Sequence, residues 1–315
     1  MPNRPSRRTM AAVRSTQVFF EGLARAAGRT PMANPARHGV DRTAQVQYGP
    51  HGAANQLDIY RSTDAGPDAP CMVYVHGGGF RSLSKDTHWL MALAFARQGY
   101  VVFNVEYRLA PDHPYPAAAE DVCAAWLWVL DNAHRFGGDP GRIGIAGDSA
   151  GANLAAALTV AACYRRPEPW AAAVFEAGVV PRVQLPACGL FQVSDTERFS
   201  RAGQVSGVAR RVVEHCTEVY LPEAHHRTAP GLADPVVVLE TSAPDRLLPP
   251  AFLPVGTWDP LQHDTRRMAA ALRARGGHAV DRYYPREVHA FHALIWRRRA
   301  RVCWRDMLGF TSTHL

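Results

Sequence analysis

The sequence predicts an α/β fold in which helices cover both faces of a mainly parallel central sheet. Short apolar runs alternate with longer helical patterns, which is the order expected when strands and helices succeed one another along the chain. The chain has 315 residues, 47% of them hydrophobic, so it can bury a large core. The sequence contains no internal repeat or low-complexity stretch. We therefore expect one core domain with appendages.

The first chemically informative element is a glycine-rich loop at residues 76–80, which directly follows the apolar strand-like run at 71–75. Glycine lets the main chain approach a ligand closely and turn its N–H groups toward that ligand. Serine hydrolases place such a loop after an early strand to bind an oxyanion. A flexible hairpin turn is the alternative interpretation.

The second element is Gly-Asp-Ser-Ala-Gly at residues 147–151, between the apolar run 142–146 and an alanine-rich helical stretch. A strained strand-to-helix turn with small neighbours holds a serine hydroxyl above the sheet. In a chain rich in glycine and alanine, the five residues alone would also suit an ordinary loop. The glycine-rich loop precedes them in the required order and at a suitable distance, so we predict Ser149 as a nucleophile.

A serine nucleophile works with a histidine base and a carboxylate acid, which follow it in the order Ser, Asp, His in α/β-hydrolases. The carboxylate is expected at the end of a later strand. Asp259 follows the apolar run 252–256, and open α/β sheets place their functional groups at the carboxyl ends of strands. Asp264 lies in the predicted first turn of the next helix, where a carboxylate usually complements the helix dipole. We therefore prefer Asp259 as the acid and keep Asp264 as its alternative.

The base is predicted by its position, because the chain has 14 histidines. Residues 278–284 have the pattern of a last strand, and His289 follows it. His292 is predicted to open the final helix, where a surface or helix-end role is expected. Five further histidines have no strand-end context and are predicted to be structural or solvated: His113, His134, His215, His225 and His226.

Together these motifs resemble those of the hormone-sensitive lipase family of α/β-hydrolases, in its bacterial esterase branch. The match extends from about residue 57 to about residue 295, with a poorly matching stretch between 180 and 233. The further segments that carry it are residues 107–118 with Glu120 and Asp121, residues 136–143, residues 259–261 and residues 289–291. The resemblance implies the α/β-hydrolase fold with a helical cap, and a reaction that needs no metal or cofactor.

The resemblance also implies a role for each motif. Ser149 is expected to attack the substrate, His289 to act as general base and acid, and Asp259 to orient the imidazole. Backbone N–H groups are expected to bind the tetrahedral oxyanion, each contributing about 10²–10³ in rate. These donors belong to Gly78, Gly79 and Ala150.

Two departures from the family pattern concern the turn at Ser149 and the strand after it. Ala152 stands where the family often has a second glycine, so the helix is expected to start slightly more tightly. A strand is expected around residues 171–183, and residues 186–195 after it lack the family's tyrosine- and proline-bearing pattern. Substrate specificity is therefore the least transferable property.

Two segments are expected to form the cap, namely residues 1–42, with helical apolar spacing, and residues 186–234, with a predicted helix at 208–221. The hydrolase core would then comprise residues 43–185 and 235–315. A cap excludes water and shapes the acyl or alcohol pocket. Plain core packing is an equal alternative for any one of its aromatic residues: Phe19, Phe20, Phe191 and Phe199.

The chain is basic, with a formal net charge of +7. Almost all of the positive charge is arginine scattered along the chain, because Lys85 is the only lysine. Arginine clusters lie within residues 4–8 and 297–301. The second is predicted to lie on a solvated face of the last helix, with an acidic partner as the alternative, and neither cluster interleaves with the aromatic residues that single-strand binders use. We predict no nucleic-acid partner.

Cysteine usage favours a reducing compartment. The six cysteines form no C-x-x-C pair and no metal-ligand spacing, so buried free thiols are expected. Residues 6–10 are similar to a twin-arginine export signal, but polar and charged residues at 14–21 interrupt the apolar core that it requires. No run approaches the roughly 18 apolar residues of a membrane span. We expect a cytoplasmic protein. The cysteines are Cys71, Cys123, Cys163, Cys188, Cys216 and Cys303.

We predict a cofactor-free serine carboxylesterase for small acyl esters, and the resemblance adds a preference for short chains. The same site would fit a lactone, an amide or a carbamate. The alternative from another class is a non-catalytic receptor for a small ligand, and the three filled triad positions favour the enzyme. Family members often pair through the last strand and helix, here residues 282–301, so the resemblance implies a homodimer as one arrangement.

Overall fold

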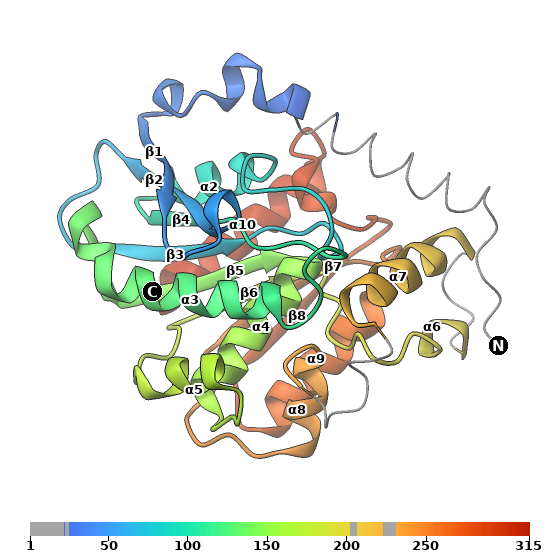
Figure 1. The fold of residues 1–315 in the computed structure, drawn as a ribbon. Helices are drawn as coiled ribbons and strands as arrows, with labels where there is room; N and C mark the ends of the chain where they lie inside the picture. Colours follow the sequence, from blue (N-terminus) through green and yellow to red (C-terminus); the bar gives the residue numbers. More distant parts are fainter. Residues whose placement is uncertain (1–21, 23–24, 202–206, 223–230) are drawn as a thin grey trace.

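The computed structural model describes residue 22 and residues 25–201, 207–222 and 231–315 (Figure 1). Its centre is an eight-stranded sheet in the order β1-β2-β4-β3-β5-β6-β7-β8. β2 runs antiparallel to β1 and β4, and the other neighbouring pairs are parallel. The strands are β1 (Val40–Gln47), β2 (Gln56–Ser62), β3 (Ala69–Val75), β4 (Val101–Val105), β5 (Gly138–Asp148), β6 (Gln184–Ala187), β7 (Ala251–Gly256) and β8 (Ala279–Tyr284).

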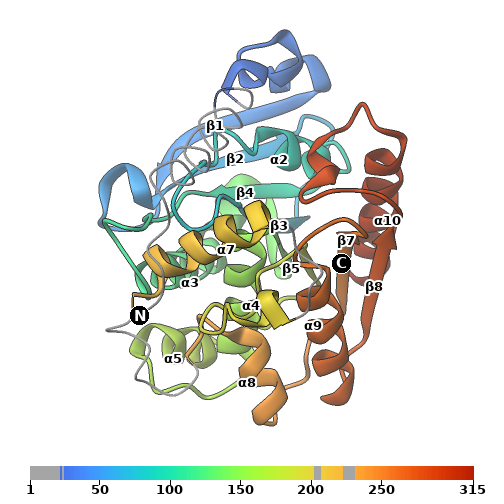
Figure 2. The same ribbon diagram turned by 90° about the vertical axis from the view of Figure 1, so that its right-hand side faces the viewer.

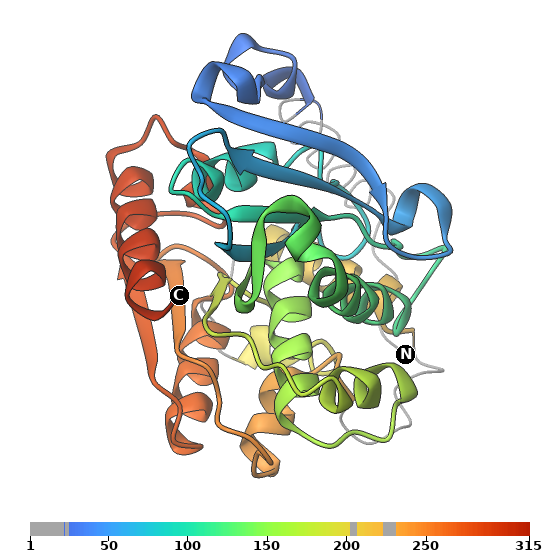
Figure 3. The same ribbon diagram turned by 90° about the vertical axis from the view of Figure 1, so that its left-hand side faces the viewer.

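Helices cover both faces of this sheet. α2 and α10 pack on one face, and α3, α4, α5, α8 and α9 contribute to the larger apolar core on the other. β1 lies at one edge of the sheet, and β8 lies at the opposite edge beside α10 (Figure 3). The helices are α2 (Trp89–Ala96), α3 (Ala117–Asn132), α4 (Ala150–Cys163), α5 (Pro169–Glu176), α6 (Arg198–Arg201), α7 (Gly207–Tyr220), α8 (Pro235–Thr241), α9 (Gln262–Ala274) and α10 (Arg298–His314), with short 3₁₀ turns η1 (Pro31–Ala33), η2 (Pro35–His38), η3 (Gly52–Asn55), η4 (Ala133–Phe136) and η6 (Phe291–Ala293).

The alternation of side chains along the central strands explains the two cores. In β3, Cys71 and Val73 belong to the larger core, whereas Met72 and Tyr74 belong to the core beneath α2 and α10. Successive side chains of a strand point to opposite faces, so a parallel strand covered on both sides is apolar throughout. The predicted α/β-hydrolase fold, with a mostly parallel sheet between helices, is confirmed.

The expected strand around residues 171–183 is wrong. Residues Pro169–Glu176 form the helix α5, and the strand β6 begins only at Gln184. Pro169 occupies the start of the helix, where its missing N–H costs nothing. Ala171, Val174 and Phe175 are buried at helical spacing, which a short alanine-rich run does not distinguish from a strand.

The predicted cap is described in part. Its first segment contains Phe19 and Phe20, which lie outside the described residues, and β1 begins at Val40 within the predicted range 1–42. In the second segment, the helix α7 (Gly207–Tyr220) agrees within one residue with the predicted helix 208–221. It crosses the end of the sheet in Figure 2. Phe191 and Phe199 are buried in the larger core, which corresponds to the core-packing alternative for both residues.

The arginine-rich start of α10 is more structured than expected. Arg297 lies 3.0 Å from a carboxylate oxygen of Glu287, whose side chain is buried, and Arg299 lies 3.9 Å from the other oxygen. The side chains of Arg297 and Arg299 are 39% and 42% exposed, so they lie on a solvated face as expected, and they also pair with a buried carboxylate. Within the described ranges, no helix combines the length and the apolar character needed to cross a membrane.

Candidate active site

Ser149 occupies the turn between β5 and α4. Its backbone has φ 54° and ψ −115°, a conformation that non-glycine residues rarely adopt and that functional sites often retain. The Ser149 N–H donates to the carbonyl of Ala187 at 2.9 Å, which ties the turn to β6. A Cβ atom on Gly151 would overlap the Val75 carbonyl oxygen and lie 2.5 Å from that of His76. The turn therefore needs glycine where α4 passes the end of β3.

The structure brings the three predicted triad residues together. Nε2 of His289 lies 2.9 Å from Oγ of Ser149, and Nδ1 lies 2.9 and 3.0 Å from the two carboxylate oxygens of Asp259. An ionised carboxylate can only accept hydrogen bonds, so Nδ1 carries the proton and Nε2 accepts from the Ser149 hydroxyl. Asp259 also accepts from the Leu261 N–H at 2.8 Å, and its side chain is fully buried.

Asp264, the alternative acid, lies outside this arrangement. Its carboxylate accepts from the Phe191 N–H at 2.9 Å and forms an ion pair with Arg198 at 2.7 Å. Asp264 is buried, and it links α9 to the segment between β6 and α6. Asp264 therefore does more than complement the helix dipole, because its carboxylate also holds two segments of the chain together.

The expectation for His292 is wrong. His292 lies in η6 rather than at the start of α10, and its side chain is buried. Its carbonyl accepts from the Trp304 Nε1–H at 2.9 Å. Burial is the main cause that lowers the pKa of His292 below its ordinary value. Of the other histidines, His113 and His134 are exposed, His215 is partly buried on α7, and His225 and His226 lie outside the described residues.

The glycine-rich loop lies between the serine turn and α7. A Cβ atom on Gly77 would lie 2.8 Å from the Asp148 carbonyl oxygen, so the loop packs directly against the residue before Ser149. Gly79 has φ +61°, which favours glycine, and a Cβ atom there would overlap the Cys216 sulfur of α7. Gly78 accepts from the Ser82 N–H at 3.1 Å, and Ala150 is the first residue of α4.

The helix α7 also packs on this loop through aromatic rings. Phe80 stacks on Tyr220 with ring centroids 3.7 Å apart and an interplanar angle of 6°. The Tyr220 carbonyl accepts from the Tyr115 N–H at 2.7 Å. The helix α7 and the predicted oxyanion loop thus form one packed unit.

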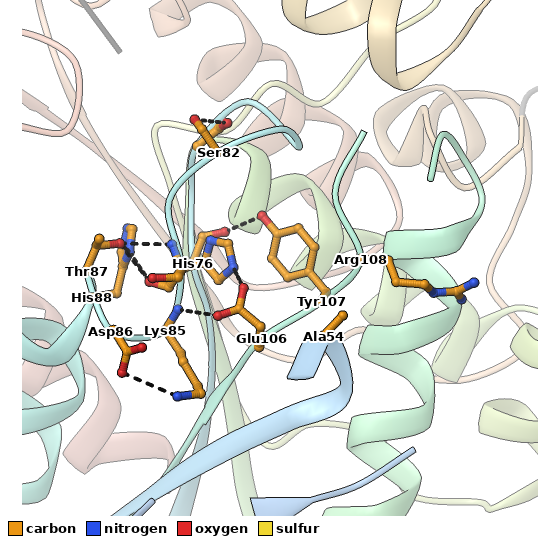
Figure 4. A network of polar contacts seen from close by, with 12 residues as sticks. Ala54, His76, Ser82, Lys85, Asp86, Thr87, His88, Glu106, Tyr107 and Arg108 are labelled. Atoms are coloured by element: carbon orange, nitrogen blue, oxygen red, sulfur yellow. Dashed lines mark hydrogen bonds and ion pairs between the residues drawn. The ribbon is translucent and has the colours of Figure 1, made fainter. Parts of the chain in front are cut away.

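A polar network that the sequence analysis missed supports the loop from below (Figure 4). Nε2 of His76 lies 2.9 Å from a carboxylate oxygen of Glu106, and the other oxygen accepts from the Lys85 N–H at 3.1 Å. The Tyr107 hydroxyl donates to the His76 carbonyl at 2.8 Å, and the two rings stack 4.2 Å apart. Nζ of Lys85 lies 3.1 Å from the buried carboxylate of Asp58. The one feature of the sequence that could have indicated this network is that Lys85 is the only lysine of the chain.

A second buried network holds Asp148, the residue before Ser149. The Tyr74 hydroxyl donates to its carboxylate at 2.8 Å, and Nε2 of His88 lies 3.3 Å from the same oxygen. Burial alone would raise the pKa of Asp148, but the neighbouring His88 lowers it well below its usual value. Burial likewise acts to lower the pKa of His88, and Asp148 raises it. His88 and Asp148 therefore form a close buried pair beneath the serine turn.

Cys188, which follows β6, also lies beside the triad. One donor atom from each of Cys188, Asp259 and His289 lies within 4.8 Å of the others. The Cys188 N–H donates to the Pro254 carbonyl at 3.0 Å, and burial is the main cause that raises the pKa of its thiol. All six cysteines are buried and free, as predicted. No sequence pattern indicates the position of Cys188, because it lies 71 residues from Asp259 along the chain.

We expect kcat/KM for ester hydrolysis to fall as the pH is lowered, with an acid-limb midpoint above 6.5. Burial lowers the pKa of His289, but Asp259 and Cys188 raise it well above that ordinary value. A general base works only when neutral, and kcat/KM reports the pKa of the free enzyme. The measurement is kcat/KM as a function of pH, with a chelator present so that trace metal ions do not bind the histidine. A midpoint below 6.5 would contradict the expectation.

Comparisons with known proteins identify the family to which the chain belongs. Residues 72–293 match the family described as alpha/beta hydrolase fold. The chain is 33% identical over 271 residues to the carboxylic ester hydrolase LipN of Mycobacterium tuberculosis, covering 84% of this chain and 67% of LipN. It is 34% identical over 231 residues to the carboxylesterase NlhH of the same organism, covering 70% of this chain and 66% of NlhH.

A solved structure agrees with these sequence matches. The esterase of Pyrobaculum calidifontis superposes with a TM-score of 0.78 at 28% identity, and the match covers 96% of this chain and 93% of that one. The chain spans about two thirds of the length of the curated relatives but nearly all of this structure. The chain therefore belongs to the α/β-hydrolase fold family, within the group of esterases that resemble hormone-sensitive lipase.

Proposed function

We propose that this protein is a serine carboxylesterase that forms an acyl-enzyme on Ser149. The observation that carries the proposal is the continuous series of contacts from Asp259 through His289 to the Ser149 hydroxyl, each 2.9–3.0 Å long. The curated relatives LipN and NlhH are named as ester hydrolases, which supports the same reaction class here.

In this mechanism Nε2 of His289 takes the proton of Ser149 as Oγ attacks the ester carbonyl carbon. The carbonyl π bond breaks, and its electron pair becomes the oxyanion of the tetrahedral intermediate. Asp259 holds Nδ1 and stabilises the imidazolium that forms. His289 then protonates the departing alcohol. In the second half, His289 deprotonates a water that attacks the acyl-enzyme, and the carboxylic acid is released as Ser149 regains its proton.

The oxyanion would accept hydrogen bonds from the main-chain N–H groups of Gly78, Gly79 and Ala150. Support comes from position: Ala150 begins α4, so its N–H stands at the positive end of a helix. The loop that carries Gly78 and Gly79 packs against Asp148 and α7. Donors fixed before the reaction stabilise developing charge without reorganisation, which is worth about 2.7–4 kcal/mol for one donor.

The function is tested by hydrolysis of p-nitrophenyl acyl esters of increasing chain length, with a matched amide, a lactone and a carbamate. We expect steady-state turnover of the esters, fastest for short acyl chains. Preferential turnover of the amide, lactone or carbamate would reassign the substrate class. A protein that binds esters without turnover would be the receptor alternative.

The acid is tested by a matched pair of substitutions, Asp259→Asn and Asp264→Asn. We expect Asp259→Asn to lower kcat by about 10⁴, because the amide favours the wrong imidazole tautomer. Asp264→Asn breaks a buried ion pair with Arg198, so it should cost about 3–5 kcal/mol of folding free energy. Its kcat at a temperature where the protein is folded should change far less. Kinetics and urea unfolding of both variants separate the two roles, and the reverse pattern would make Asp264 the acid.

Two further proposals concern the surroundings of the enzyme. We propose a cap over the hydrolase core. It comprises the predicted ranges 1–42 and 186–234 without the residues that belong to β1 and β6, and α7 packed on the glycine-rich loop supports its second segment. We also propose a cytoplasmic homodimer that pairs through residues 282–301. Six buried free thiols suit a reducing compartment, and Val288 and Trp296 expose apolar surface in the pairing segment. Light scattering of the purified protein tests the dimer.

A further inference from the structure

A third potential metal ligand, the sulfur of Cys188, lies close to His289 and Asp259. Sulfur, nitrogen and carboxylate oxygen are brought within 4.8 Å of one another there by three separate segments of the chain. The mechanism proposed above does not use Cys188. A thiol, an imidazole and a carboxylate are the three ligand types that Zn²⁺ takes in proteins.

The distances are close to those that a zinc ion requires. Bond lengths of about 2.3 Å to sulfur and 2.0–2.2 Å to nitrogen and oxygen place tetrahedral donors roughly 3.4–3.6 Å apart. Nδ1 of His289 and the nearest Asp259 oxygen are already 2.9 Å apart, and the donor atoms span at most 4.8 Å. Shifts of about 1 Å bring all three donors to a single ion.

The imidazole is the solvent-accessible ligand of the three. Asp259 and Cys188 are buried, whereas 35% of the His289 side chain is exposed, so an ion would approach from the imidazole side. The burial of the other two ligands excludes water from two sides of the ion. A water molecule would complete the fourth position, as in open zinc sites.

We propose that Cys188, Asp259 and His289 form an inhibitory site for a thiophilic divalent cation of the Zn²⁺ or Cd²⁺ type. On binding, the Cys188 S–H bond breaks, a metal–sulfur bond forms, and the proton goes to solvent. The Nδ1 proton moves to Nε2, because the metal takes the Nδ1 lone pair. Nε2 then carries hydrogen toward Ser149 and cannot accept the hydroxyl proton, so the nucleophile is not activated.

This site distinguishes the chain from an ordinary triad, in which the Asp–His pair alone offers two hard or borderline ligands. Thiolate ligands select soft cations, so Mg²⁺ and Ca²⁺, which prefer oxygen, should not bind here. The inference about inhibition rests on the proposed esterase function. The inference about binding does not.

The test titrates Zn²⁺ and Cd²⁺ into the purified full-length protein. We expect one ion per chain by calorimetry, a thiolate-to-Cd²⁺ charge-transfer band in the ultraviolet, and loss of ester hydrolysis that a chelator reverses. Cys188→Ser and Cys188→Ala should lose the band and weaken inhibition at least tenfold, each measured against its own uninhibited rate. Mg²⁺ at the same concentration should not inhibit.

The matched control is Cys163→Ser. Cys163 is also buried, but it ends α4, the helix that Ser149 begins, and its sulfur contacts the Leu247 carbonyl at 3.6 Å. Fourteen residues of helix separate it from the triad by about 20 Å. We expect its basal activity, Cd²⁺ band and inhibition to match those of the unchanged chain.

Two results would overturn the proposal. One is equal inhibition of the Cys188 variants and the unchanged chain, which would place the ion on other ligands. The other is the absence of a Cd²⁺–thiolate band. Failure of the esterase function is distinguishable, because Ser149→Ala keeps all three ligands. That variant should bind Cd²⁺ with the same band whether or not the protein hydrolyses esters.

Discussion

We expect Ser149→Ala to lower kcat for ester hydrolysis by about 10⁴–10⁶ while the protein stays folded. Removal of a triad nucleophile has effects of this size in serine hydrolases, because the rest of the triad has nothing to activate. The remaining rate over water would come from binding and the oxyanion donors. The measurement is steady-state turnover of the best p-nitrophenyl ester, beside labelling by a fluorophosphonate probe.

The fold should survive this substitution for a local reason. The tie between the turn and β6 is made by the Ser149 N–H, which alanine retains, and the side chain contacts His289 through Oγ. Ser312→Ala is the matched control, since its exposed hydroxyl donates to the Gly309 carbonyl far along α10. We expect full labelling and turnover for Ser312→Ala and neither for Ser149→Ala. Labelled Ser149→Ala would identify a different nucleophile.

The parts of this site that were predictable from sequence are those in which a short motif meets a strand end. Gly147, Gly151 and the glycines of residues 77–79 mark places where the main chain passes close to other backbone. Asp259 and His289 follow β7 and β8 within a few residues, and parallel strands bring their carboxyl ends to one side of the sheet. The sheet topology therefore brings residues that are far apart in the sequence together at one end of the sheet.

The contacts that were not predictable join residues that lie far apart in the sequence and belong to no recognisable motif. Asp264 meets Arg198 across 66 positions, and Tyr74 meets Asp148 across 74. Neither pair has a local pattern, because each depends on which helices, strands and loops the fold brings together. Cys188 belongs to this class, since its position beside Asp259 follows from the adjacency of β6 and β7.

Burial also explains why His292 was misplaced. Its spacing from His289 predicts a helix start at the surface, but residues 293–297 separate His292 from α10. Phe291 beside it is fully buried in the core beneath α2 and α10, and this draws the short turn inward. Periodicity in three or four residues does not encode such packing.

The second large effect is expected from Gly151→Ala, although alanine is the better helix former. A Cβ atom at this position would overlap the Val75 carbonyl oxygen and lie 2.5 Å from that of His76. Both obstacles are backbone, so α4 or the end of β3 must move. We expect a loss of about 3 kcal/mol in the free energy of unfolding, at the upper end for overpacked positions. Urea unfolding measures it.

The same clash should reach the chemistry, because the chain continues from His76 directly into the oxyanion loop. Displacement of one oxyanion donor is worth about 10²–10³ in kcat, and we expect at least this loss for the folded Gly151→Ala protein. Gly309→Ala in α10 is the matched control, since a Cβ atom there meets nothing within 4 Å. In a helix interior that change should stabilise by about 0.5–1 kcal/mol and leave kcat unaltered. Equal behaviour of the two variants would mean that the contact between α4 and β3 does not constrain the oxyanion loop.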